Sequence, residues 1–170
     1  MRIRIYNAIS HDGYVLDKLG EHFIYFTADK KEFLTIYKEA DCLVLDYENF
    51  LYLTKMKVLP ATKKFVVVMT EETAEKGNDK LWFTALDPKQ IKREIKIQGY
   101  SNVLCLVNNS LSSKILAQKI ATEVHIAIYH SIEGGGIEKV EIIDSVKKKN
   151  TPTIVTSKNV ERLSFVLKKV

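Results

Sequence analysis

Proline, glycine and long apolar runs are scarce in this sequence, and each scarcity excludes a class of protein. There are only 3 prolines and 7 glycines among 170 residues and no low-complexity run, which argues against a disordered, collagen-like or linker-rich chain. No window approaches the roughly 18 uninterrupted apolar residues of a membrane span. The N-terminal sequence MRIRIYNAIS lacks the hydrophobic block of a signal peptide. We therefore expect a cytoplasmic protein with no membrane partner.

Cysteine is limited to Cys42 and Cys105, which lie inside the apolar runs ADCLVLDY and NVLCLVNN. In such a run cysteine usually behaves as a small buried hydrophobe. Neither a C-x-x-C spacing nor a nearby histidine cluster accompanies the two thiols, so we expect no disulfide and no metal site. His125 and His130 bracket a predicted strand, where a structural role is more common than a catalytic one.

The net charge is +5, but the positive side chains are not gathered into a recognition motif. Lysines occur as scattered pairs and one triplet at residues 147–149, without an arginine-rich stripe, an aromatic RNA-binding motif or a zinc finger. We therefore expect a solvated basic surface and no nucleic-acid partner. A basic balance of this size also suits a protein that binds phosphorylated small molecules.

The motifs of several common enzyme classes are absent. The sequence holds no G-x-S-x-G, no P-loop and no G-x-G-x-x-G, which disfavours hydrolase, ATPase and ordinary Rossmann interpretations. With 46% hydrophobic and 9% aromatic residues, the chain can still fill one ordinary core. We expect a single domain over residues 1–170.

Segments with strand and helix patterns alternate along the chain. Residues 2–9 alternate with a period of two, whereas 41–45 and 64–70 are continuous apolar runs, as expected of strands covered on both faces by helices. Further strands are predicted at 101–108 and 124–132, a weaker one at 81–87, and helices at 30–40, 48–59, 88–99 and 110–121. Asp87 is predicted to cap the third of these helices, with Pro88 at its first position and Gly99 at its end.

The C-terminal segment differs from the rest in having two β-rich stretches within 151–170, on either side of residues 157–159. This pattern predicts an antiparallel hairpin that closes a largely parallel sheet. The predicted fold class is therefore α/β, with a mostly parallel sheet, helices on both faces and a C-terminal antiparallel hairpin.

Ligands of open α/β sheets bind outside the carboxyl ends of the strands, so the candidate site residues are those that follow each apolar run. They are Ser10 to Gly13, Asp46 and Tyr47, Thr70, Val107 to Ser110, and Gly134 to Gly136. Their hydroxyls, amides and exposed backbone suit phosphate and ribose binding more than nucleophilic catalysis. Asp12 is either a turn former or a polar site residue, and the glycine triplet is either a tight turn or a ligand contact.

Five segments of the chain resemble the reductase domain of riboflavin-biosynthesis deaminase-reductases. Residues 8–15, AISHDGYV, are similar to that family's opening motif A-x-S-x-D-G-x-I/V-A, and residues 121–137, ATEVHIAIYHSIEGGGI, to its segment ending in G-G-G. ADCLVLDYENF stands where the family has a strand that ends in a Gly-Arg-Thr-like turn, and KKFVVVMT stands where it has a strand that ends in Ser or Thr. The final hairpin also matches. The resemblance implies a dihydrofolate-reductase-like three-layer sandwich.

The resemblance also implies an activity, the reduction of a pyrimidine-linked ribosyl group or of a related pterin-like substrate with NADPH. By position, Ser10, Asp12, Gly13, Gly134 and Gly135 would border the substrate, and Asp12 would supply the catalytic acid. The residues implied in cofactor binding are Ala8, Asp46, Thr70, Val107, Asn108, Asn109, Ser110 and Leu111. Of these, Thr70 would approach the adenosine phosphate, and the last five would wrap the pyrophosphate. A homodimer formed through sheet edges is implied as well.

Tyr6 and His130 depart from the family pattern, standing in place of a lysine and a proline, and so do two segments where the cofactor would bind. Asn108, Asn109 and Ser110 replace a glycine pair that lets the backbone approach the pyrophosphate closely. Asp46-Tyr47-Glu48 replaces a Gly-Arg-Thr turn and brings two carboxylates to the place where phosphate would lie. These departures leave a second hypothesis open, a non-catalytic relative that keeps the scaffold and binds another ligand or a protein partner.

Overall fold

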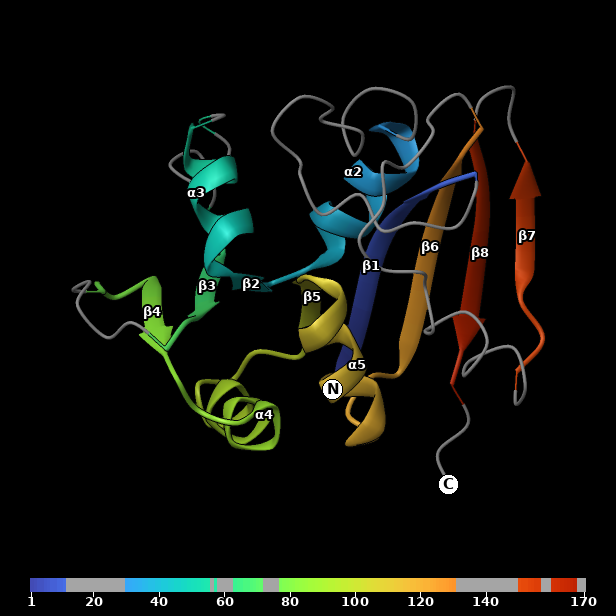
Figure 1. Ribbon diagram of the computed structural model, residues 1–170. Helices are drawn as coiled ribbons and strands as arrows, with labels where there is room; N and C mark the ends of the chain where they lie inside the picture. Colours follow the sequence, from blue (N-terminus) through green and yellow to red (C-terminus); the bar gives the residue numbers. More distant parts are fainter. Residues whose placement is uncertain are drawn as a thin grey trace.

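The protein is built on one eight-stranded sheet, seen in a computed structural model that describes residues 1–11, 30–55, 57, 63–71, 77–130, 150–156 and 160–167. The strands follow one another across the sheet in the order β4-β3-β2-β5-β1-β6-β8-β7, with β4 and β7 at the two outer edges (Figure 1). Their bounds are Arg2–Ser10 (β1), Cys42–Asp46 (β2), Phe65–Met69 (β3), Leu81–Thr84 (β4), Asn102–Leu106 (β5), Glu123–Tyr129 (β6), Thr153–Thr156 (β7) and Val160–Val166 (β8).

The pairing of the strands divides the sheet into a parallel part and an antiparallel end. β1 to β6 pair with one another in parallel, whereas β8 runs antiparallel to both β6 and β7. The prediction of a mostly parallel sheet with a C-terminal antiparallel hairpin is therefore confirmed. The weaker strand prediction at 81–87 is also confirmed, because β4 lies there at the edge of the sheet, parallel to β3.

Helices cover both faces of the sheet and make it the middle of three layers. They are α2 (Lys30–Glu39), α3 (Tyr47–Lys55), α4 (Pro88–Ile97) and α5 (Asn109–Ala117). Ile91 and Ile95 of α4 and Ile115 of α5 belong to the core on one face. Phe33 of α2 and Phe50 of α3 belong to the core on the other. Each core removes a continuous apolar surface from water, which is the main force that holds the layers together.

Helix α4 begins and ends where its sequence signals predict. The Asp87 side chain accepts a hydrogen bond from the Lys89 amide, Gln90 completes a capping box, and Pro88 is the first helical residue. Gly99 follows the helix with a φ of +87°, a conformation that glycine adopts without a steric penalty. The Asp87, Pro88 and Gly99 predictions are confirmed.

The two cysteines are free and buried on the same face of the sheet, as predicted. Burial raises the pKa of the Cys105 thiol to about 12, and it raises the pKa of Cys42 as well. Both side chains therefore act as apolar core groups rather than as nucleophiles.

Candidate functional site

The carboxyl ends of the parallel strands bring together predicted site residues that are far apart in the chain. Ser10 ends β1, Asp46 ends β2, Thr70 follows β3 and Val107 follows β5. Because β5 lies between β1 and β2, the segment after β5 lies between Ser10 and Asp46. We call this edge, where β1, β2, β3 and β5 end, the carboxyl edge; it is the candidate site.

Asp46 is bound by donors from two directions. One carboxylate oxygen, Oδ1, accepts a hydrogen bond from the Asn49 amide at 2.8 Å, the N-cap interaction that starts α3. The other, Oδ2, accepts from Asn49 Nδ2 at 2.7 Å and from the Asn108 amide at 2.7 Å. Asp46 is only 6% exposed. Its carboxylate thus ties the end of β2 and the start of α3 to the segment that leads from β5 into α5.

The segment between β5 and α5 is held from its other side by a buried pair of polar side chains. Asn7 of β1 donates from Nδ2 to Ser112 Oγ of α5 at 3.3 Å, and Ser112 Oγ donates to the Val107 carbonyl, also at 3.3 Å. Asn108 caps α5 itself, since its Oδ1 accepts from the Leu111 amide at 3.0 Å. Sequence analysis missed these roles of Asn7 and Ser112, although a polar residue in the apolar strand 2–9 was the available signal.

The other predicted site residues have different surroundings. Ser10 is fully buried and lies opposite Tyr129 of β6, whereas the Thr70 amide donates to the Thr84 carbonyl at 3.0 Å. Ala8 is buried in the core on the α2 and α3 face, and Ser110 is exposed at the start of α5. Asp12, Gly13, Gly134, Gly135 and Gly136 lie outside the described residues, so their roles stay predictions.

The carboxyl edge has donors that suit a nucleotide phosphate and one buried group that opposes it. The amides of the first turn of α5, with the Ser110 hydroxyl, lie at the helix N-terminus, where backbone N–H groups and the helix dipole favour an anion. The Asp46 carboxylate carries charge of the same sign as a phosphate and already accepts the Asn108 amide proton. These donors suit one anionic group such as a phosphate, and the Asp46 carboxylate opposes its binding.

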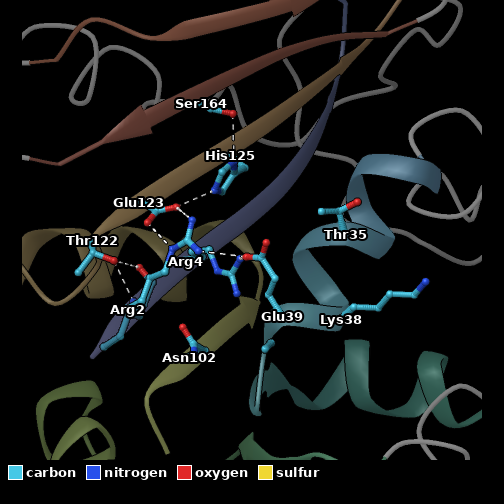
Figure 2. A network of polar contacts seen from close by, with 12 residues as sticks. Arg2, Arg4, Thr35, Lys38, Glu39, Asn102, Thr122, Glu123, His125 and Ser164 are labelled. Atoms are coloured by element: carbon cyan, nitrogen blue, oxygen red, sulfur yellow. Dashed lines mark hydrogen bonds and ion pairs between the residues drawn. The ribbon is translucent and has the colours of Figure 1, made fainter.

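A second polar cluster lies at the opposite edge of the sheet, where the parallel strands begin (Figure 2). Arg4 is fully buried and donates from Nη1 to Glu39 Oε2 at 2.6 Å, and Arg2 Nη1 reaches the same oxygen at 3.0 Å. Arg2 also donates from Nε to Glu123 Oε1 at 2.6 Å. These contacts join β1 to the end of α2 and the start of β6, far from the carboxyl edge, so the cluster supports the fold rather than the candidate site.

His125 belongs to this second cluster and has the structural role expected of it. Its ring nitrogens lie 3.0 Å from Ser164 Oγ and 3.3 Å from Glu123 Oε2. Burial lowers the pKa of His125, against the opposing effect of Glu123. Burial alone would raise the pKa of Glu123, but its hydrogen bond with Arg2 and the charges of Arg2 and His125 bring that pKa below its usual value.

The described part of the chain contains neither a metal-binding cluster nor a membrane-spanning helix. No group of three or more His, Cys, Asp or Glu side chains there is placed to hold a metal ion. None of the helices described has both the length and the apolar character needed to cross a bilayer.

Comparison with solved structures identifies the fold. A riboflavin biosynthesis protein from Shewanella sp. PV-4 matches with a TM-score of 0.71 and 18% sequence identity, over 99% of this chain and 100% of that one. The chain has a dihydrofolate-reductase-like fold. The fold implied by the sequence resemblance is thereby confirmed.

Two larger proteins share this fold over part of their length. A Thermotoga maritima diaminohydroxyphosphoribosylaminopyrimidine deaminase/5-amino-6-(5-phosphoribosylamino)uracil reductase matches 97% of this chain with a TM-score of 0.67 and 15% identity. Acinetobacter baumannii RibD also matches 97%, with a TM-score of 0.66 and 12% identity. The chain spans 56% and 57% of these two proteins. No family model and no curated protein matches the sequence.

Proposed function

We propose that this chain is an NADPH-dependent reductase that acts on a small pyrimidine- or pterin-like substrate at the carboxyl edge. The observation that carries the proposal is the arrangement of that edge, where Ser10, Thr70 and the first turn of α5 lie at the carboxyl ends of β1, β3 and β5 in one parallel sheet. The Thermotoga relative, described as a deaminase and reductase, has the same fold at 15% identity. This similarity supports a reductase class, whereas the cofactor and the substrate class come from the sequence resemblance.

Asp12 and the glycines are assigned by position in this proposal. Ser10, Asp12 and Gly13 follow β1 and would border the nicotinamide and the substrate, together with Gly134 and Gly135. The nicotinamide cofactor supplies the hydride when bound, so the chain's part is to align the substrate, exclude water and donate a proton. Asp12 is the proposed proton donor.

Titration with NADPH, followed by cofactor fluorescence, tests the cofactor assignment. The proposal expects a saturable change, and a linear response up to millimolar NADPH would refute it. Turnover of NADPH with a pyrimidine substrate tests the catalytic assignment. Asp12→Ala should abolish that turnover, whereas Asp79→Ala, which alters an exposed aspartate in the turn before β4, should leave it unchanged.

The second hypothesis, a non-catalytic relative that binds another ligand or protein, is favoured by one contact. The Asn108 amide is already bound by Asp46 at 2.7 Å, so a phosphate would have to compete for it. Turnover that depends on Asp12 would rule this hypothesis out.

We also propose that the protein is a cytoplasmic homodimer. The support for a dimer is β7, whose four residues are all exposed and which pairs with β8 alone among the described strands. In Figure 1, β7 forms the outer edge of the sheet. A strand edge of this kind offers backbone groups for pairing with a second copy.

A further inference from the structure

We propose that the Asp46 carboxylate weakens the binding of phosphate groups at the carboxyl edge. It should therefore lower the affinity for NADPH more than the affinity for NADH. This inference rests on the proposed function, since it concerns the same site. It assigns to Asp46 a role in specificity that is separate from its role in capping α3.

Asp46 and a bound phosphate would compete for one hydrogen-bond donor, the Asn108 amide. The Asn108 amide lies two residues beyond the end of β5, and it donates to Asp46 Oδ2 at 2.7 Å. A phosphate oxygen at the start of α5 could use this amide only by displacing the carboxylate. Displacement would break a charge-assisted hydrogen bond, a class that is about twice as strong as a neutral one.

The Asp46 carboxylate is held in place close to the donor, so its negative charge cannot move away from a bound phosphate. Asp46 is almost fully buried, and its position is held by the Asn49 amide and the Asn49 side chain. A carboxylate fixed in this way cannot swing into solvent, and water and salt screen it less than they screen an exposed group. Glu48 provides a contrast, because it is exposed in the first turn of α3.

In the proposed function, Asp46 lies between Thr70, assigned to the adenosine phosphate, and the segment entering α5, assigned to the pyrophosphate. It lies opposite Met69 in the register of β2 and β3, and Met69 immediately precedes Thr70. On its other side it contacts the segment that enters α5. The pyrophosphate and the adenosine phosphate would therefore both meet its charge. NADPH carries a phosphate that NADH lacks, so Asp46 should lower the affinity for NADPH more than the affinity for NADH.

Asp41 is a natural control, because it makes the equivalent contact at the other end of the same two strands. Its carboxylate accepts hydrogen bonds from the Ser101 and Asn102 amides, both at 3.0 Å, where β5 begins. Asp41→Asn removes the same charge and disturbs the same pair of strands, but at the edge opposite the site. Glu48→Gln removes an exposed charge beside the site and tests whether burial matters.

The experiment is equilibrium binding of NADPH, NADH and inorganic pyrophosphate to the unmodified protein and to Asp46→Asn, Asp41→Asn and Glu48→Gln. The substitution Asp46→Asn should tighten the binding of NADPH and pyrophosphate about ten-fold and that of NADH by less, because it removes the charge and weakens the hydrogen bond to the Asn108 amide. The two control variants should stay within about two-fold of the unmodified protein. Equal affinities of Asp46→Asn and the unmodified protein for NADPH and pyrophosphate would overturn the inference.

Failure of the proposed function gives a different result. If neither nucleotide binds any of the proteins, the reductase proposal fails, and pyrophosphate alone decides the role of Asp46. Tighter pyrophosphate binding by Asp46→Asn then supports the inference, and unchanged binding refutes it. Should Asp46→Asn fail to show a native circular dichroism spectrum, Asp46→Ser serves instead, because its hydroxyl can still cap α3 without a charge.

Discussion

Arg4 and Glu39 form an ion pair in which the arginine is fully buried and the glutamate is 49% exposed. Their closest atoms, Nη1 and Oε2, are 2.6 Å apart. Arg4 Nε and Nη2 have no hydrogen-bond acceptor among the described residues, so this buried cation depends on Glu39. The ion pair also joins the last residue of α2 to β1, so it helps to hold that helix in position on the sheet.

Glu39→Gln should therefore destabilise the protein by about 2 kcal/mol, since it leaves the buried Arg4 charge without its counter-ion. Urea denaturation measures the loss. Glu32→Gln is the comparison variant, because Glu32 is also 49% exposed and lies 3.5 Å from Arg162, which is buried as well. This ion pair is longer and Arg162 has a further interaction, so the substitution should cost less, about 1 kcal/mol. Adding Arg4→Met to Glu39→Gln should recover part of the loss. Equal effects of the two glutamate substitutions would contradict this account of Arg4.

Stability should fall as the pH drops below the normal pKa of histidine. Because burial lowers the pKa of His125 in the folded protein, the unfolded chain takes up a proton near pH 6.5 that the folded protein does not. This contribution is fully present above pH 6.5 and is lost as the pH falls toward the folded pKa, at up to about 1.4 kcal/mol per pH unit. Urea denaturation midpoints should be measured at pH 7.5 and 5.5. The midpoint should fall less between these pH values for His125→Gln than for the unmodified protein, because the variant lacks the histidine contribution to the pH dependence of stability. Parallel pH profiles would refute the assignment.

Filling a cavity beneath α4 should stabilise the protein. The cavity measures about 20 Å³ and is almost entirely apolar, with Val103, Cys105 and Ile91 among the residues that line it. Val103→Ile adds one methylene group toward this space and should raise the free energy of unfolding by about 0.5 to 1 kcal/mol. Val67→Ile, at a fully buried position on the same face that does not line the cavity, should instead be destabilising. A thermal melt of each variant compares them, and a loss in both would mean that the cavity cannot admit the group.

A charge on β7 should weaken the proposed dimer. Val155 is 51% exposed on this edge strand, and Val155→Lys places a charge where a second copy would pair. Ile97→Lys is the control, because Ile97 is an exposed apolar residue on α4. Sedimentation velocity should show a dimer for the unmodified protein and for Ile97→Lys, and a shift toward monomer for Val155→Lys. A monomeric unmodified protein would refute the dimer.

The carboxyl edge could be located from the sequence because strand ends are local features. Ser10, Asp46, Thr70 and Val107 each follow an apolar run, and the topology of parallel sheets brings such ends to one edge. The hydrogen-bond partners of Asp46 could not be predicted in the same way. Its position suggested repulsion of phosphate, but the sequence contains no local signal for a bond between its carboxylate and the Asn108 amide.

The sequence by itself determined the type and order of the elements and the limits of α4, because capping residues and apolar periodicity act over a few neighbouring positions. Tertiary structure alone decided which polar groups meet. Asp46 and Asn108 are 62 residues apart, and Asn7 and Ser112 are 105 apart. They make contact because the strand order places β5 between β1 and β2, and buried polar groups must find partners within hydrogen-bond distance.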